Sequence, residues 1–212
     1  WYFNMPAAGT FDEAWKQVED EKGFSAPYGL TTAERRHPLF RSHGTGTCEW
    51  DGAIWPFASS QTLTAMANYI NNYPTPIVNK ETFFKQMKLY VESQHHRGRP
   101  YIGEYLDETN GAWLMGDRER SRYYNHSTFN DLIITGIVGL RPQADGSIEV
   151  NPLLPEDTWN YFCLDKINYH GKTLTIVYDK TGQQYHQGKG LMLFVNGNKV
   201  AQRKDIGKLI YK

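Results

Sequence analysis

Two segments of the sequence combine carboxylates with large aromatic side chains. Residues 48–57 read Cys-Glu-Trp-Asp-Gly-Ala-Ile-Trp-Pro-Phe and set Trp50, Asp51 and Trp55 just ahead of an expected helix. Residues 103–113 read Gly-Glu-Tyr-Leu-Asp-Glu-Thr-Asn-Gly-Ala-Trp, so several acids and aromatics share one stretch. Aromatic rings suit the stacking of sugars, and paired carboxylates can protonate a leaving oxygen and activate water, as glycoside hydrolysis requires. The same residues could instead brace their loops and cap a helix.

Helices are predicted on either side of these two segments, because the spacing of apolar residues before residue 141 is helical. The predicted helices cover residues 11–22, 57–71, 80–98 and 127–140. Thr10 with Glu13 predicts a capping box for the first helix, and Asn79 a cap for the third. The last helix is apolar nearly all round, which is typical of a helix that is buried on most sides.

After Pro142 the apolar period becomes two, which indicates strands. The predicted strands cover residues 147–151, 162–169, 173–178, 191–195 and 199–203. Gly171 closes one hairpin, and Asn196-Gly197 is a strong signal for a type I′ turn in another. The pattern predicts an antiparallel β module, either half of a sandwich or one sheet packed on the helices.

Composition excludes several classes of function. Lys and Arg together number 23, as do Asp and Glu, so the chain lacks the basic surface of a nucleic-acid binder. No apolar run is long enough to span a bilayer. The histidines show no ligand spacing, so we expect no metal site and no cofactor, and His126 is expected to be structural unless it faces a site. Cys48 and Cys163 are expected to be unpaired thiols.

The motifs carry a resemblance to a known family. Trp-Asp-Gly-Ala-Ile-Trp-Pro-Phe at 50–57 resembles the W-x-G-x-x-W element of six-hairpin glycoside hydrolases, in particular the mannosylglycerate-hydrolase-like and family 63 α-glucosidase groups. Residues 103–111 resemble their late-barrel segment, which contains a catalytic glutamate, and residues 126–140 resemble the closing inner helix. Residues 146–155 and 159–182 resemble the β module that follows in bacterial members.

The resemblance implies an α+β chain: the last helical hairpins of an (α/α)6 toroid over residues 1–141, then an antiparallel β-sandwich-like module over 142–212. It also implies inverting hydrolysis of an α-glycosidic bond, with Glu104 as the general base. Substrate contacts are expected from Trp50, Asp51, Trp55, Tyr105, Asp107, Trp113 and His126. The chain departs from the family 63 element at Asp51, where that element has Arg, and its aromatic directly follows Glu104.

The length of the helical part has a further implication. Six helical hairpins need roughly 350–400 residues, far more than lie before residue 142. The resemblance then implies that the general acid, an Asp in these families, lies upstream of Trp1. The chain also opens without a signal peptide, so we expect a processed product or a piece of a longer protein, for which a periplasmic or secreted location is favoured.

The expected partners are an oligosaccharide or polysaccharide and the missing N-terminal part of the same protein, with no nucleic acid and no membrane span. The fragment alone is expected to self-associate, because the flanks of the 127–140 helix would be exposed. Two other functions remain open on the residues: a non-catalytic carbohydrate-binding module with an aromatic platform, and a structural docking domain. If Glu104 is not the base, Glu108 is the expected substitute, ahead of Asp107.

Overall fold

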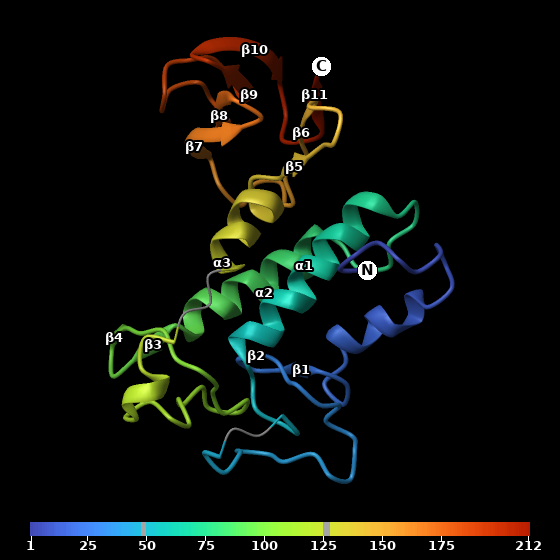
Figure 1. Ribbon diagram of the computed structural model, residues 1–212, viewed down its shortest axis with the longest axis vertical. Coiled ribbons are helices and arrows are strands. Elements are labelled where there is room, and N and C mark those ends of the chain that lie inside the picture. Colours follow the sequence, from blue (N-terminus) through green and yellow to red (C-terminus); the bar gives the residue numbers. More distant parts are fainter. Residues whose placement is uncertain (48–49, 125–127) are drawn as a thin grey trace. The chain divides into compact units, whose positions relative to one another are not determined.

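The computed structural model describes residues 1–47, 50–124 and 128–212 (Figure 1). The chain is α+β, as predicted, with its longer helices in the first part and a β module at the C-terminal end. It divides into two compact units, Trp1–Phe129 and Asn130–Lys212. The predicted division into a barrel portion over residues 1–141 and a β module over 142–212 stays a prediction.

The first unit is built on two helices that pack together, α1 (Pro56–Asn72) and α2 (Lys80–Ser93). Pro56 opens α1, where its missing N–H is not needed for a helical hydrogen bond. Asn79 caps α2, because its side-chain oxygen accepts a hydrogen bond from the Thr82 N–H at 2.9 Å. These helices and the Asn79 cap are confirmed predictions. No helix of the described residues is long and apolar enough to cross a membrane.

A short hairpin replaces the predicted last turn of α2. Strand β3 (His95–His96) pairs with β4 (Arg99–Pro100), and the two residues between them, Arg97 and Gly98, have φ angles of 51° and 73°. Positive φ at both central residues is the type I′ geometry, which matches the twist of paired strands. The prediction that α2 runs to Gly98 is therefore wrong, because the helix ends at Ser93.

The N-terminal helix also differs from its prediction. η1 (Asp12–Val18) is a short 3₁₀ helix rather than an α-helix over 11–22, and no side chain caps its start, so the Thr10–Glu13 capping box is wrong. Tertiary packing explains the difference, since Trp15 stacks on Tyr69 of α1 with ring centroids 5.2 Å apart and planes 10° from parallel. An aromatic contact of this kind stabilises the segment more than a local capping motif does.

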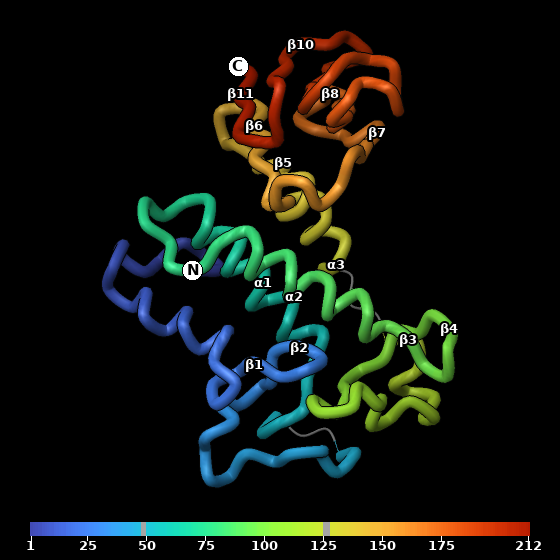
Figure 2. The backbone as a smooth tube through the Cα atoms, turned by 180° about the vertical axis from the view of Figure 1, so that it is seen from behind, coloured from blue at the N-terminus to red at the C-terminus, as the bar shows by residue number. Residues whose placement is uncertain are grey.

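Two long loops lie at the end of the helical pair where α1 begins and α2 ends (Figures 1 and 2). The first loop follows a small hairpin formed by β1 (Ser25–Ala26) and β2 (Gly29–Leu30) and leads into α1. The second loop follows β4 and contains a 3₁₀ turn, η2 (Glu119–Ser121). The two segments that combine acids with aromatics are therefore brought to the same end of the unit.

The second unit contains two antiparallel sheets, of strand order β10-β9-β8-β7 and β11-β6-β5. The strands are β5 (Leu140–Pro142), β6 (Ile148–Val150), β7 (Tyr161–Tyr169), β8 (Lys172–Asp179), β9 (Gly190–Val195), β10 (Asn198–Arg203) and β11 (Leu209–Tyr211). All but β5 and β11 confirm predicted strands. The predicted turn at Asn196-Gly197 is also confirmed, with φ angles of 49° and 81°. Fully buried side chains at the centre of this unit include Ile148, Leu153, Leu174, Ile176, Leu191 and Leu193.

The helix predicted over 127–140 is irregular and shorter. α3 (Thr128–Asp131) continues into a π-helical segment, η3 (Leu132–Ile137), and the chain enters β5 at Leu140. Gly139 makes this change of direction possible, because it has a φ of 81° and packs against the Asn151 carbonyl where a Cβ would clash. Apolar periodicity could not distinguish this helix-to-strand transition from a longer helix.

Candidate active site

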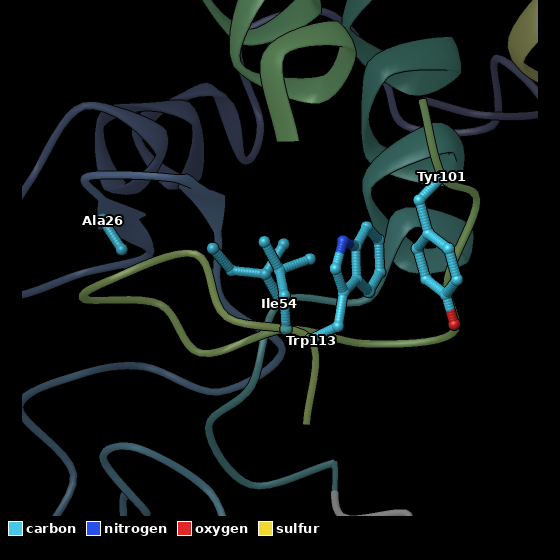
Figure 3. Packing of buried hydrophobic residues seen from close by; sticks show 5 residues of the cluster. Ala26, Ile54, Tyr101 and Trp113 are labelled. Carbon is cyan, nitrogen blue, oxygen red and sulfur yellow. The ribbon is translucent and has the colours of Figure 1, made fainter. Parts of the chain in front are cut away.

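The two acid-and-aromatic loops are joined by backbone hydrogen bonds. Ile54 and Leu106 exchange two N–H to carbonyl bonds of 3.0 Å each, and Leu106 also forms a bridge with Trp113. A hydrophobic cluster of Ala26, Ile54, Tyr101, Leu106 and Trp113 lies beneath this connection, with Ile54 between Ala26 and Trp113 (Figure 3). The loops therefore form one packed assembly, although they are separated by both helices in the sequence.

An aromatic stack crosses from one loop to the other. The rings of Trp50 and Trp55 lie 4.1 Å apart at 21°, and those of Trp55 and Tyr105 lie 4.7 Å apart at 12°. Trp55 and Tyr105 are 3% and 0% exposed, whereas Trp50 is 48% exposed. The stack thus presents one indole to solvent, supported from below by two buried rings.

Glu104 directly precedes Tyr105, the buried end of this stack, in the sequence. Its side chain is only 7% exposed, and its Oε2 accepts a short hydrogen bond from the Ser121 hydroxyl. The Arg120 guanidinium lies 3.6 Å from the same oxygen. The hydroxyl donates a hydrogen bond to the carboxylate, and the guanidinium places the opposite charge beside it. No described residue donates a hydrogen bond to the other oxygen, Oε1, so this atom is available to accept a proton.

The backbone around Glu104 is fixed by close packing. A Cβ at Gly103 would clash with the indole ring of Trp113, so only glycine fits at that position. The Trp113 side chain is 7% exposed, and its N–H donates to the His95 carbonyl at 2.8 Å. Trp113 therefore supports the loop from inside the hydrophobic cluster, and sequence alone could not distinguish this place from a sugar-facing one.

The hydrogen-bond donors around Asp107 come from its own turn and from His43 of the first loop. Its carboxylate is 3% exposed and accepts hydrogen bonds from the Thr109 N–H and hydroxyl (2.7 and 2.6 Å), the Asn110 amide (2.9 Å) and His43 Nδ1 (3.0 Å). Burial alone would raise the pKa of Asp107, but these donors outweigh it and hold the pKa below its usual value. Asp107 thus organises the turn that follows Glu104.

Glu108 is fully buried and ties the second loop to the first. It accepts hydrogen bonds from the Ser42 hydroxyl at 2.6 Å and from the His43 N–H at 3.2 Å. Asp51, in contrast, is half-buried: its Oδ2 forms an ion pair with Arg41 at 3.0 Å, and its buried Oδ1 has no hydrogen-bond partner among the described residues. The three acids other than Glu104 therefore already have close partners, and His126 lies outside the described residues.

Sequence reasoning did not identify Ser121, Arg120 or His43. They lie in stretches without helix or strand periodicity, far along the chain from the carboxylates that they contact. No spacing rule connects them to Glu104 or Asp107, so only the folded loops reveal the pairs. Among the described residues, no three His, Cys, Asp or Glu side chains are grouped so as to hold a metal ion.

Comparison with known proteins places this assembly among the glycoside hydrolases. Residues 1–127 match the family model of the "Mannosylglycerate hydrolase MGH1-like glycoside hydrolase domain", and residues 140–202 match that of "Glycosyl hydrolase family 65, C-terminal domain". The chain therefore belongs to the MGH1-like glycoside hydrolase family, and the predicted resemblance to the mannosylglycerate-hydrolase-like group is confirmed.

A solved structure described as "Sialidase" is similar over nearly the whole chain. The sequence identity is 64% and the TM-score 0.96, and the match covers 99% of this chain. It covers only 20% of the solved chain, so these 212 residues span about a fifth of the length of that relative. This is consistent with the prediction that the sequence is a piece of a longer glycoside hydrolase.

Proposed function

We propose that this chain supplies the general base and an aromatic wall of the substrate cleft of a glycosidase. The observation that carries the proposal is the setting of Glu104, a nearly buried carboxylate held by Ser121 and Arg120. It directly precedes Tyr105, one ring of the aromatic stack formed with Trp50 and Trp55. Membership of a glycoside hydrolase family supports the reaction class. The substrate is an oligosaccharide or polysaccharide, one sugar of which stacks on the exposed face of Trp50.

In the proposed mechanism, Glu104 Oε1 accepts a proton from a water molecule as the water attacks the anomeric carbon of an α-linked sugar. Ser121 and Arg120 contact the other carboxylate oxygen and hold the side chain in position. A single displacement by water inverts the anomeric configuration. Trp55 and Tyr105 act by supporting the Trp50 ring, since both are buried.

The general acid comes from outside residues 1–212. Inverting glycosidases separate their two carboxyl groups by about 6.5–9.5 Å, with the acid on the opposite side of the scissile bond from the base. Asp107 and Glu108 are committed to hydrogen bonds within the loops, and Asp51 to Arg41. All three therefore have partners within the two loops, and we place the general acid elsewhere in the polypeptide.

The test uses Glu104→Gln in the full-length protein. The amide keeps the shape of the side chain but cannot accept the proton, so turnover is expected to fall roughly 10²–10⁴-fold while sugar affinity is retained. Glu92→Gln, an exposed change on α2, is the matched control and keeps full activity. NMR of the first product formed reports whether the anomeric configuration inverts.

Two results would contradict the proposal. Wild-type turnover by Glu104→Gln would move the base role to another carboxylate, first of all Glu108. A full-length protein that binds sugar through Trp50 but cleaves no glycoside would favour the carbohydrate-binding module instead. The exposed, supported indole of Trp50 is the observation that keeps this second candidate open.

A further inference from the structure

The middle of the first loop, at Ser42 and His43, is bound to two acids that follow Glu104 in the second loop. The Ser42 hydroxyl and the His43 backbone N–H donate to the two carboxylate oxygens of Glu108, at 2.6 and 3.2 Å. His43 Nδ1 lies 3.0 Å from Asp107 Oδ2, and because an ionised carboxylate only accepts, the imidazole donates this hydrogen bond. Asp107 and Glu108 are 3% and 0% exposed, so both anchors are buried.

The backbone of His43 is held in an uncommon conformation. Its φ is 65°, in the left-handed region, which few residues with a side chain adopt and in which Asn, Asp and His are the most frequent. The His43 side chain is 65% exposed, so burial of the ring does not stabilise this conformation. The Thr109 hydroxyl is also 3.0 Å from Nδ1, but it donates to Asp107 at 2.6 Å, so the imidazole proton is still the donor. The hydrogen bonds to Asp107 and Glu108 therefore fix the loop here.

Arg41, which precedes this pair, is bound in turn to the residue that follows Trp50. Its backbone N–H donates to the Asp51 carbonyl at 2.8 Å, and its guanidinium pairs with Asp51 Oδ2 at 3.0 Å. The two stretches of backbone touch, because a Cβ at Gly52 would clash with the Arg41 carbonyl oxygen. The segment at 41–43 therefore connects the backbone next to Trp50 with the second loop.

We propose that His43 is a positioning residue, which sets the place of the exposed Trp50 indole relative to Glu104. A sugar stacked on that ring then presents its anomeric carbon to the water from which Glu104 takes a proton. This inference rests on the proposed function of these two residues. Trp55 supports one face of the indole, whereas the 41–43 segment holds the backbone that follows it. Precise placement matters, because a shift of about 1 Å between reacting groups can lower a rate about 10²-fold.

A direct contact between the imidazole and the sugar is the alternative role for an exposed histidine. The two roles use different atoms of His43. Positioning needs the Nδ1–H donor that Asp107 accepts, whereas a contact with sugar would use the other ring nitrogen, Nε2. Asparagine distinguishes them, because its side-chain amide can donate to Asp107 and it adopts the left-handed region readily, but it has no counterpart of Nε2.

The first experiment compares His43→Gly, His43→Ala and His43→Asn in the full-length protein, with an oligosaccharide that the wild type hydrolyses. The first two variants both remove the donor, and glycine keeps the positive φ without a steric cost, so it serves even where alanine impairs folding. In both, kcat is expected to fall roughly 10–100-fold with KM within about threefold of wild type, because the sugar still stacks on Trp50. His43→Asn is expected to recover most of the loss.

The matched control is His186→Gly. His186 is an exposed histidine of the second unit with a φ of 56°, so the substitution makes the same chemical change at a similar backbone conformation. This variant is expected to keep wild-type kinetics. Wild-type kcat in His43→Gly would overturn the proposal. A raised KM that His43→Asn fails to recover would also overturn it, since that result identifies a direct contact with the sugar.

Hydrogen exchange followed by mass spectrometry tests the inference without turnover. In His43→Gly, peptides from residues 39–47 are expected to exchange at least about tenfold faster than in wild type, while peptides from α1 are unchanged and His43→Asn restores protection. Unchanged exchange in His43→Gly would overturn the role of His43 alone. Wild-type turnover by Glu104→Gln, in contrast, would remove the base assignment and leave the exchange result intact.

Discussion

Two carboxylates of one loop, Glu104 and Asp107, are buried in different ways. Asp107 is surrounded by donors from its own turn and from His43, so both its oxygens are occupied. Glu104 has one oxygen held by Ser121 and Arg120, and no described residue donates to the other. A proton acceptor needs an oxygen that can receive the proton in a fixed position, which is why we propose Glu104 as the base and give Asp107 a structural role in the loop.

Replacing Asp107 by Asn is expected to destabilise the protein in a pH-dependent way. The lowered pKa of Asp107 means that its ionised form stabilises the fold above its unfolded pKa of about 3.9, and that this stabilisation is lost as the pH falls through the lower, folded pKa. Asp107→Asn should therefore cost about 1.5–3 kcal/mol at pH 7, and the difference from wild type should shrink below about pH 4.

Denaturant unfolding at a series of pH values measures this effect. The control is Asp117→Asn, which removes a surface ion pair with Arg97 whose two side chains are 73% exposed, and costs at most about 1 kcal/mol. A pH-independent loss for Asp107→Asn would show that shape rather than charge matters at this position.

At the residue scale, composition predicted which loops would carry the chemistry, but not which side chains contact their carboxylates. Acids and aromatics at 48–57 and 103–113 indicated where chemistry was expected, and these loops do join through Ile54 and Leu106. The hydrogen bonds that each carboxylate accepts depend on Ser42, His43 and Ser121, and tertiary folding sets the positions of these residues. For the same reason, sequence alone could not tell whether Trp113 contacts a sugar or supports the loop.

At the scale of elements, the strength of the local signal decided which predictions hold. α1 and α2 were predictable because several apolar side chains repeat at helical spacing and Asn79 marks a start. The strands of the second unit were predictable because alternation and the Asn196-Gly197 turn agree. β5 begins at Leu140, inside the apolar run that predicted a helix, and β11 reads Leu-Ile-Tyr, without alternation of apolar and polar residues.

The cap of α2 gives a prediction at this scale. Asn79→Ala removes the acceptor of the Thr82 N–H and is expected to lower the free energy of unfolding by about 0.5–2 kcal/mol. Asn79→Asp or Asn79→Ser keeps an acceptor and should recover most of the loss. The midpoint of denaturant unfolding, followed by circular dichroism, measures both; equal losses for all three variants would show that the cap hydrogen bond is not the stabilising contact.

At the scale of the whole molecule, we propose that catalysis requires more than this chain. The acids of residues 1–212 nearest to Glu104 belong to the same pair of loops, and we place the opposite wall of the cleft on other parts of the polypeptide. The family could be predicted from motif order along the chain. The packing of Trp1 and Trp15 against α1 could not, because no periodicity encodes it.

Residues 1–212 expressed alone are therefore expected to show no glycoside hydrolysis, even where the full-length protein is active. Without a protonated carboxyl group across the scissile bond, the leaving oxygen departs as an unfavourable alkoxide. Release of reducing sugar by the isolated chain and by the full-length protein is measured side by side. Turnover by the monomeric chain would contradict the prediction and point to Asp51 as an acid within these loops.

The stacking of Trp50 on Trp55 also makes the loop assembly an optical reporter. Two indoles whose centroids lie 4.1 Å apart are electronically coupled, so their ultraviolet emission differs from that of separate tryptophans. Of this pair, only Trp50 is exposed, which means that a soluble quencher reaches the coupled rings from one side. A molecule bound against that side would shield them, and the quenching constant, compared with that of Trp50→Phe, would follow occupancy without any attached dye.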